Sequence, residues 1–398
     1  MPSHPIRADI RLTAGDFYAR DAHAAFDWMR ANAPVYWDEA GSTWGVTRYD
    51  DVMAVSKDPV VFCNGAGMRA DAPVPMPFMI SLDDPMHKRR RGLVNKGFTV
   101  RRVQDREARI REISRDLIAK GRKLGRFDFV MDLAAWLPLI VIGDMLGVVP
   151  DHYDDLLRWS DDLVRGTGAM TDDVASRALV AFEEYTAYQT GVIADRRRSG
   201  RSDDLVGVLV HAEIDGEKLT DEEILWESLL ILVGGDETTR HVITGGTYEL
   251  LRDPSRMAAL RRDPFRIPLA VEEMLRWVTP IQNMARTATR DSELRGQKIR
   301  EGDKLLLLYP SANRDERMFK DPHRFDIARS PNDHIAFGFG AHYCLGASLA
   351  RLELRVFFEE LTAGMSDLAL ASDDPPPLRA SNFIVGIEHL DVVVGAAS

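Results

Sequence analysis

The sequence predicts a mainly helical α+β fold, in which small β-sheets accompany a larger set of helices. Helical patterns fill residues 104–200 almost without a break, and a longer apolar pattern of helical spacing runs over residues 220–253. Short apolar runs bounded by turn residues are typical of strands. We therefore expect a β-rich part over roughly residues 30–80, completed by strands near the C-terminus, and a helical part over roughly residues 84–370.

The 398 residues are expected to form a single domain, residues 1–398, because no linker rich in Gly, Ser or Pro divides them. A net charge of −11 argues against nucleic acid or an anionic membrane surface as a partner. Two cysteines, Cys63 and Cys344, are too few for a disulfide framework or a cysteine zinc site, which fits a reducing cytoplasm. No secretion signal is visible, and no run reaches the ~18 apolar residues of a membrane span. We expect a soluble cytoplasmic protein without a membrane anchor.

Helix and strand alternate over the first part of the chain. Residues 21–32 follow a helical pattern, with Asp21 at the N-cap position. Residues 35–37 and 44–46 have the character of short strands around a turn, and residues 49–57 are helical again.

Residues 63–80 form a loop of unusual composition. Glycines and prolines exclude a long helix, yet methionines and a phenylalanine make the segment more apolar than a solvated loop. Such a segment either plugs the core or forms the wall of a pocket.

The next helix is strongly basic at its start. Asp84 suits the N-cap position and Pro85 suits the first helical position. His87 and Arg91 are four residues apart and therefore project from one face. Positive charge at a helix N-terminus opposes the helix dipole, which favours an anionic partner for this face. A solvated basic surface is the alternative.

Residues 165–170 separate two helical patterns with the sequence Arg-Gly-Thr-Gly-Ala-Met. Small residues with few local contacts suit the hinge of a lid. An ordinary turn between helices explains the sequence equally well.

Residues 220–253 predict the central helix of the fold. Thr220 and Glu223 form a capping box at its start, and at 1.5 Å per residue about 33 residues extend about 50 Å, enough to cross the molecule. The middle reads Gly-Gly-Asp-Glu-Thr-Thr over residues 234–239. Paired glycines cost roughly 1–2 kcal/mol relative to alanine, and buried acids cost more unless they are paired or hydrated. Such features mark a functional site, with a structural role for the cluster as the alternative.

Cys344 sits in the glycine-rich stretch 337–346, directly before an apolar helical pattern. Gly338, Gly340 and Gly346 permit backbone conformations closed to other residues and the close approach of a flat group. A thiol at a helix entrance is also pushed toward thiolate by the helix dipole. The stretch predicts an anionic sulfur ligand beside a large planar partner. A buried structural cysteine is the alternative.

The spacing Phe337-x-x-Gly340-x-His342-x-Cys344-x-Gly346 resembles the haem-binding loop of the cytochrome P-450 family at every defining position. The resemblance extends along essentially the whole chain. It implies the cytochrome P-450 fold, a triangular prism that holds haem b between the long central helix and the helix after the cysteine loop. It also implies that the Cys344 thiolate is the axial iron ligand and favours O–O cleavage.

The same resemblance assigns the residues that hold the haem. Those expected at the propionates are His87, Arg91, Arg286 and His342, and those expected at the ring are Phe337, Gly338 and Gly235. Arg89 and Arg90 are expected to face the electron donor instead. Gly92 stands where relatives commonly have a further arginine, so that contact is absent here.

In the central helix, the resemblance implies that the glycines open an oxygen-binding groove. Thr238 then hydrogen-bonds the dioxygen and its water, and Glu237 relays protons toward it. Asp236, at the variable position of the motif, completes the expected catalytic set. Arg240 and His241 follow directly and are able to pair with these acids.

Glu273 and Arg276 lie three residues apart on one helix face, a weak signal by itself because exposed ion pairs contribute only ~0–1 kcal/mol. They match the family motif Glu-x-x-Arg, which supports the haem loop from behind. The resemblance implies a third, arginine partner in or near residues 321–325. We expect Arg324 in this role, with Arg329 as the substitute.

The walls of the substrate pocket are expected from several segments. The candidates are Met76, Phe78, Met79, Ile80, Val233, Pro280, Ile281, Met284, Phe383, Ile384 and Val385. They are uncharged, which suits a large apolar molecule. Residues 383–385 have the character of a hairpin tip that either reaches the pocket or only packs in a sheet. The motif at 234–241, Met-Leu-Gly after residues 142–144, and Asn382-Phe383 look like the bacterial cholesterol side-chain hydroxylases.

The sequence therefore predicts a haem-thiolate monooxygenase that hydroxylates the terminal side-chain methyl (C26/C27) of cholesterol or cholest-4-en-3-one and then forms the acid. Dioxygen is the co-substrate, and electrons are expected from a separate ferredoxin and ferredoxin reductase, because no fused reductase follows the haem loop. The alternatives are another large apolar substrate (terpenoid, fatty acid or macrolide-like), a haem protein that only binds ligands, and a helical scaffold. Glu237 and Thr238 argue against mere binding, which needs no proton relay.

Overall fold

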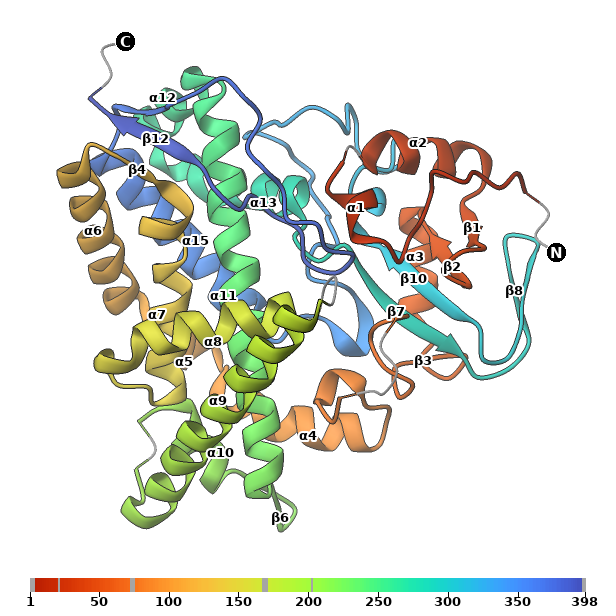
Figure 1. The fold of residues 1–398 in the computed structure, drawn as a ribbon, viewed down its shortest axis with the longest axis horizontal. Coiled ribbons are helices and arrows are strands. Elements are labelled where there is room, and N and C mark those ends of the chain that lie inside the picture. Colours follow the sequence, from red (N-terminus) through yellow and green to blue (C-terminus); the bar gives the residue numbers. More distant parts are fainter. Residues whose placement is uncertain (1–3, 21, 72–75, 167–170, 202, 396–398) are drawn as a thin grey trace.

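The apolar pattern at residues 220–253 folds as the central helix α11 (Asp221–Leu251). The predicted capping box is present: Thr220 Oγ1 accepts from the Glu223 N–H at 3.1 Å, and Glu223 Oε2 accepts from the Thr220 N–H at 3.0 Å. Figure 1 shows α11, in green, running through the helical part of the molecule. The structure, a computed structural model, describes residues 4–395 except 21, 72–75, 167–170 and 202.

Helices surround α11 and bury its apolar surface. The helices of this part are α6 (Glu107–Leu124), α7 (Trp136–Leu146), α8 (Tyr153–Arg165), α9 (Asp172–Ser199), α10 (Leu205–His211), α12 (Pro254–Arg262), α13 (Ile267–Val278) and α15 (Ala347–Gly364). In Figure 1, α8 and α9 cross over α11, and both contact it. The helical pattern predicted for residues 104–200 is confirmed, with one short strand, β4 (Arg126–Asp128), interrupting it.

The other α-helices lie mostly in the N-terminal part. They are α1 (Gly15–Tyr18), α2 (Ala22–Asn32), α3 (Tyr49–Lys57), α4 (Met86–Val94), α5 (Val100–Gln104) and α14 (Tyr309–Ala312). The helices predicted at residues 21–32 and 49–57 are confirmed by α2 and α3, whereas Asp21 itself lies outside the described residues. Helix α4 begins one residue later than predicted, because Pro85 and not Asp84 occupies its N-cap position. Asp84 still satisfies an amide of the first turn, since its Oδ1 accepts from the Lys88 N–H at 3.1 Å.

The main sheet joins strands from distant parts of the chain in the order β1-β2-β10-β7-β3. Their bounds are β1 (Val35–Asp38), β2 (Thr43–Val46), β3 (Phe62–Cys63), β7 (Asn283–Ala288) and β10 (Lys304–Leu308). Strands β1 and β2 form the predicted antiparallel pair. Strand β10 runs parallel to β2, with Leu306 opposite Gly45, and antiparallel to β7, with Leu306 opposite Ala285. The sheet thus takes two strands from within residues 84–370, where four consecutive leucines supply a strand buried between neighbours.

Smaller strand pairs complete the fold. A three-stranded sheet joins β11 (Leu368–Leu370), β12 (Asp391–Val394) and β4, and two hairpins consist of β5 (Glu213–Ile214) with β6 (Glu217–Lys218) and β8 (Ser292–Leu294) with β9 (Gln297–Ile299). Residues 383–385 are tied to residues 280–282 through an antiparallel bridge between Ile281 and Ile384. No helix within the described ranges is long and apolar enough to cross a membrane.

Candidate active site

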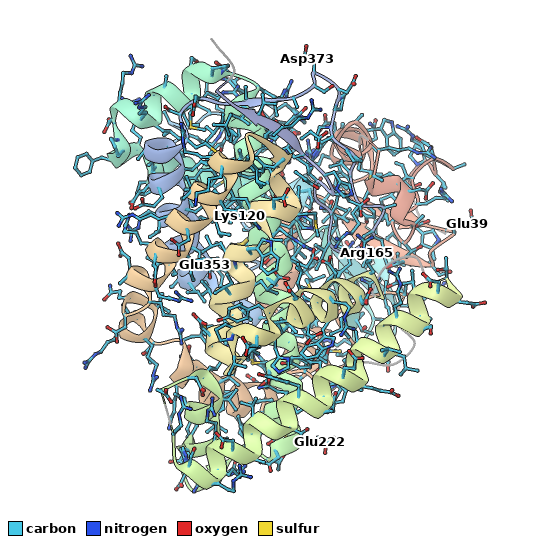
Figure 2. All side chains as sticks on the ribbon, turned by 60° about the vertical axis from the view of Figure 1, so that its left-hand side comes forward. Glu39, Lys120, Arg165, Glu222, Glu353 and Asp373 are labelled. Atoms are coloured by element: carbon cyan, nitrogen blue, oxygen red, sulfur yellow. The ribbon has the colours of Figure 1, made fainter. Side chains whose placement is uncertain are left out.

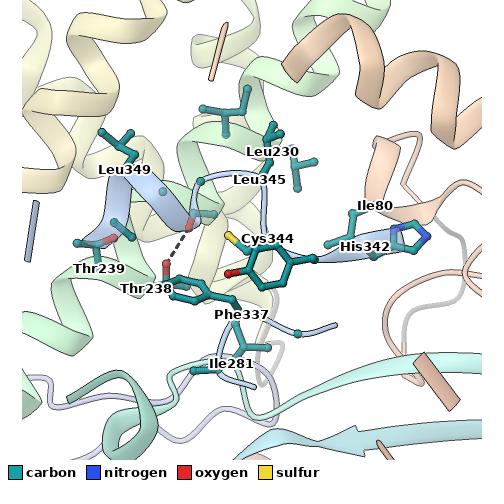
Figure 3. A pocket seen from close by; sticks show the side chains of 18 of the residues that line it. Ile80, Leu230, Thr238, Thr239, Ile281, Phe337, His342, Cys344, Leu345 and Leu349 are labelled. Carbon is teal, nitrogen blue, oxygen red and sulfur yellow. Dashed lines mark hydrogen bonds between the residues drawn. The ribbon is translucent and has the colours of Figure 1, made fainter. Parts of the chain in front are cut away.

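A cavity lies between α11, the start of α15 and the predicted cysteine loop. Figure 3 shows Cys344, Thr238 and Phe337 around it. Its wall is mostly apolar. The apolar lining residues include Met79, Ile80, Phe98, Ile142, Leu230, Ile231, Val242, Pro280, Ile281, Met284 and Leu349.

The cysteine loop holds its shape through glycine and backbone contacts. Gly338 and Gly340 have φ values of 68° and 77°, in the left-handed region that favours glycine. A Cβ at Gly340 would also come within 2.4 Å of the Ser56 carbonyl oxygen, so only glycine fits. The Cys344 N–H donates to the Phe337 carbonyl at 2.9 Å, and the sulfur faces the cavity. The predicted glycine-dependent turn is therefore present.

The protein surroundings of Cys344 do not by themselves favour its thiolate form. Burial raises its pKa, although the Gly346 and Ala347 amides and the charge of Arg91 act in the opposite direction. The predicted push of the helix entrance is present but is outweighed. A metal cation at the sulfur deprotonates such a thiol, so the site suits an iron ligand better than a free nucleophile.

Two arginines and two histidines gather on one part of the cavity wall. The rings of His87 and His342 lie 4.0 Å apart, centroid to centroid, and Arg91 and Arg286 line the same cavity. Within the part of the chain that the structure describes, neither guanidinium has a carboxylate partner, and His87 Nε2 is buried without a hydrogen bond. Burial first, and then the charges of His87, Arg286 and Arg91, lower the pKa of His342 to about 3. Two guanidiniums without a carboxylate and a buried ring nitrogen without a partner fit a flat cofactor that carries two carboxylates, as haem does.

Tyr309 is a cavity residue that the sequence analysis did not identify. It is buried, and its hydroxyl lies beside Arg286 and under Gly338, where an added Cβ would come within 3.5 Å of it. Its position directly after β10 depends on the sheet register, and no local sequence motif predicts that register.

Arg90, expected at the electron donor, is buried instead. Its exposed fraction is 7%, and it pairs with Glu223 at 3.0 Å and Glu227 at 3.2 Å. Arg89 pairs with Glu217 and, at 3.1 Å, with Glu223. The prediction for Arg90 is therefore wrong, because α11 places two acids against α4.

The middle of α11 presents its glycines and Thr238 to the cavity. A Cβ at Gly234 would meet no atom within 4 Å, whereas one at Gly235 would come within 2.6 Å of Ile142. Thr238 Oγ1 donates to the Gly234 carbonyl at 2.8 Å, as the dashed line in Figure 3 shows. The hydroxyl therefore already has an acceptor, and it reaches the cavity by rotating about χ1.

The two acids of the motif do not line the cavity. Glu237 is fully buried and contacts Arg240, His241 at 3.0 Å and Arg379 at 2.9 Å. The predicted pairing with Arg240 and His241 is confirmed. Asp236 accepts from Ser160 at 2.8 Å, and burial raises its pKa to about 6. The structure thus brings Thr238 to the cavity but keeps Glu237 and Asp236 in polar clusters behind it.

Glu353 is a buried acid of the cavity that the sequence analysis missed. It lies on α15, is 1% exposed and lines the cavity, and its Oε2 has no hydrogen-bond partner within the described residues. Burial, and then the charge of Asp236, raise its pKa well above the usual range. Figure 2 shows it among the packed helices, away from the rim where Glu222 and Asp373 lie. The sequence feature that could have identified Glu353 is the position of an acid between the apolar residues Leu352 and Leu354.

Glu273 and Arg276 form a fully buried, two-pronged ion pair with distances of 2.7 and 2.8 Å. The third partner is Arg329, whose Nε donates to Glu273 Oε2 at 3.0 Å. The choice of Arg324 is wrong: its side chain is 69% exposed, and only its carbonyl takes part, accepting from Arg276 and Arg329.

A second carboxylate beside this network, Glu272, supports the cysteine loop through Arg351 and His334. It pairs with Arg351 at 2.7 Å and with His334 at 3.0 Å, and the Arg351 guanidinium lies 4.6 Å above the Phe337 ring. Burial raises the pKa of Glu272, but the hydrogen bonds from His334 and Arg351 outweigh it and hold the pKa at about 2.

We expect Glu272→Gln to destabilise the protein in a pH-dependent way. A carboxyl with a depressed pKa contributes stability above its unfolded pKa, and this contribution is lost as pH falls from about 5 through about 2. The variant should lose about 3 kcal/mol of unfolding free energy at neutral pH and show a weaker acid dependence. Urea unfolding between neutral pH and about pH 3 measures both. Parallel curves for the two proteins would contradict the role of Glu272.

The predicted substrate walls are partly on the cavity. Met79, Ile80, Pro280, Ile281 and Met284 line it. Behind Ile281 and Met284, an apolar cluster contains Val233, Phe383 and Ile384. The remaining candidates, Met76, Phe78 and Val385, are elsewhere: Met76 is exposed, Phe78 packs on Trp226, and Val385 belongs to the N-terminal core.

Comparisons with known proteins give a consistent result. A family model described as cytochrome P450 matches residues 267–363. A steroid C26-monooxygenase of Mycobacterium tuberculosis (strain ATCC 25618 / H37Rv) is 48% identical over 388 residues, covering 97% of this chain and 97% of that protein. A methyl-branched lipid omega-hydroxylase of Mycobacterium bovis is 40% identical, covering 98% of this chain and 96% of that protein. The crystal structure of CYP109E1 from Bacillus megaterium in complex with corticosterone is similar with a TM-score of 0.87 and 32% identity, covering 95% of this chain and 100% of that one.

Proposed function

The chain belongs to the cytochrome P450 family, and from this premise we propose that it hydroxylates the terminal side-chain methyl of cholesterol or cholest-4-en-3-one and then forms the acid. The observation that carries the substrate proposal is the uncharged wall made by Met79, Ile80 and residues 280–284. An apolar cavity of this kind binds a large hydrocarbon through burial of its surface. The similarity to steroid C26-monooxygenases supports the same choice.

The family carries haem b on a cysteine thiolate. When bound, the haem supplies activation of dioxygen, and thiolate ligation favours O–O cleavage. Cys344 is the ligand, because it is the cysteine that lines the cavity within the described residues. His87, Arg91, Arg286 and His342 would hold the propionates, since the two guanidiniums have no carboxylate partner among the described residues and the two imidazole rings can donate N–H groups.

Thr238 holds a proton at its Oγ1 and delivers it by rotating from the Gly234 carbonyl into the cavity. Glu237 is the acid that resupplies it. In its buried position it is held by Arg240 and Arg379, so it takes part only after leaving one of these cations. Asp236, with a pKa raised to about 6 by burial, is a second source of protons near neutral pH.

Terminal hydroxylation is a matter of position. The terminal C–H bonds of the side chain are stronger than the neighbouring tertiary bond, so an unconstrained oxidant prefers the tertiary carbon. A wall that holds the methyl group close and the tertiary carbon away reverses this order. Electrons come from a separate ferredoxin and its reductase, and the unpaired cysteines fit a cytoplasmic location.

Titration of the ferric holoenzyme with cholest-4-en-3-one tests the proposal. We expect a low- to high-spin shift with a dissociation constant around or below about 1 µM, and a terminal alcohol followed by the acid as products. A methyl-branched fatty acid serves as the competing substrate. Hydroxylation mainly on the rings or at the tertiary carbon, or no spin shift with any sterol, would remove the sterol proposal.

A further inference from the structure

Glu227 is a buried acid that the haem site and the motif of α11 leave unexplained. It lies on α11 between Ile224 and Ile231, in a stretch that is apolar apart from Ser228, and its side chain is 0% exposed. Its Oε1 accepts from the Met79 backbone N–H at 2.9 Å and from Arg90 Nη1 at 3.2 Å. A carboxylate with so few partners is costly to bury.

Arg90 on α4 completes a clasp around the same segment. Its Nη1 also donates to the Pro77 carbonyl at 2.6 Å, and its Nη2 pairs with Glu223 at 3.0 Å. The chain from Pro77 to Met79 is therefore held at one end by Arg90 and at the other by Glu227. We call Arg90, Glu227 and the two backbone groups that they bind the 77–79 clasp.

The clasp is connected directly to the cavity wall. Phe78, between its two attachment points, packs edge-on against Trp226, with ring centroids 5.7 Å apart. Met79 and Ile80, which follow, line the cavity. Any movement of the 77–79 backbone therefore shifts two side chains of the wall.

A stabilising role alone does not account for this arrangement. Buried ion pairs are often replaceable by apolar residues without loss of stability, because desolvation offsets their attraction. A hydrogen-bonded ion pair does, however, fix the position of the groups that it binds, since its hydrogen bonds allow few geometries. Here the groups that it fixes belong to a wall of the substrate cavity.

We propose that Arg90 and Glu227 are positioning residues that set where Met79 and Ile80 stand, and so determine which carbon of the substrate is oxidised. The identity of the substrate in this inference rests on the proposed function. The role of the clasp is independent of the proposed function, because the clasp acts on any molecule that touches this wall.

The charge state of the clasp changes near neutral pH. Burial raises the pKa of Glu227 to about 7, against the lowering effect of Arg90 and the Met79 amide, and Glu223 adds to the rise. Below this pH the protonated acid loses its attraction to Arg90, so the wall becomes less fixed. We expect the fraction of terminal product from the wild-type enzyme to fall as pH drops from about 8 to about 6.

Glu227→Gln and Arg90→Gln test the proposal in the holoenzyme, with Lys88→Gln as a matched control that removes an exposed charge from the same helix. Glutamine at 227 keeps an acceptor for the Met79 amide, which favours folding. With cholest-4-en-3-one we expect both variants to keep normal haem content and CO spectra. We expect the ratio of tertiary to terminal product to rise about threefold to tenfold, with no change in Lys88→Gln. In Glu227→Gln the pH dependence of this ratio should vanish.

Several outcomes overturn the inference. One is a product ratio in both variants equal to that of Lys88→Gln. Another is a product ratio in a folded Glu227→Gln that equals the wild-type ratio at pH 8, which decides the matter even if Arg90→Gln fails to fold. If wild type takes no sterol, the proposed function fails separately, and the same ratio is measured on the methyl-branched fatty acid, which has the same choice of terminal and tertiary carbon.

Discussion

We expect Cys344→Ser to lose both the CO-complex absorption band of thiolate-ligated haem and all hydroxylase activity, while the chain still folds. Oxygen in place of sulfur removes the soft anionic ligand on which the band and the O–O cleavage depend. The loop should keep its shape, because it rests on Gly340 and on the bond from the Cys344 N–H to the Phe337 carbonyl rather than on the sulfur. Circular dichroism, haem content and the reduced CO spectrum measure these properties separately.

Cys63→Ser is the matched control for this prediction. Cys63 lies in β3, paired with Thr287 of β7, and does not line the cavity. The variant should keep the CO band and the activity of wild type. A normal band in Cys344→Ser, or its loss in a folded Cys63→Ser, would show that the ligand has been assigned to the wrong residue.

The parts of the fold that follow local rules were predictable from the sequence. The capping box at Thr220 and the stop near Asp253 depend on neighbouring residues only, and α11 has these limits. The turn around Cys344 is likewise local, since glycines at positions 338 and 340 favour the positive φ values that the structure has there. The motif spacing then identified the chemistry, because family members share it.

Features that depend on tertiary packing were not predictable in the same way. Glu237 does not line the cavity and pairs with Arg240 and Arg379. Arg379 is distant in sequence, so no local pattern indicates this pairing. The burial of Arg90 follows from its partner Glu227 on another helix. One signal was nevertheless present: Glu227 and Glu353 both interrupt apolar helical patterns, and each is buried at a site next to the cavity.

The arginine that completes the Glu273–Arg276 network was likewise not predictable from the sequence, because its position depends on tertiary packing. Arg324 and Arg329 both follow α13 in the segment that wraps that pair of residues, and the sequence motif does not say which side chain turns inward. In the structure Arg329 is 8% exposed, and its guanidinium donates to Glu273 and to the carbonyls of Lys320, Asp321 and Arg324. It therefore ties the segment before the cysteine loop to α13.

We expect Arg329→Ala to lower the unfolding free energy by about 3 kcal/mol, because it breaks a buried ion pair and removes three hydrogen bonds to backbone carbonyls. Haem retention should fall with it, since the tethered segment continues into the cysteine loop. Arg324→Ala should behave like wild type, because only the backbone carbonyl of residue 324 takes part and alanine keeps it. Urea unfolding and haem content of the two variants decide the matter: equal stability in both, or a larger loss in Arg324→Ala, would mean that Arg329 does not complete the network in solution.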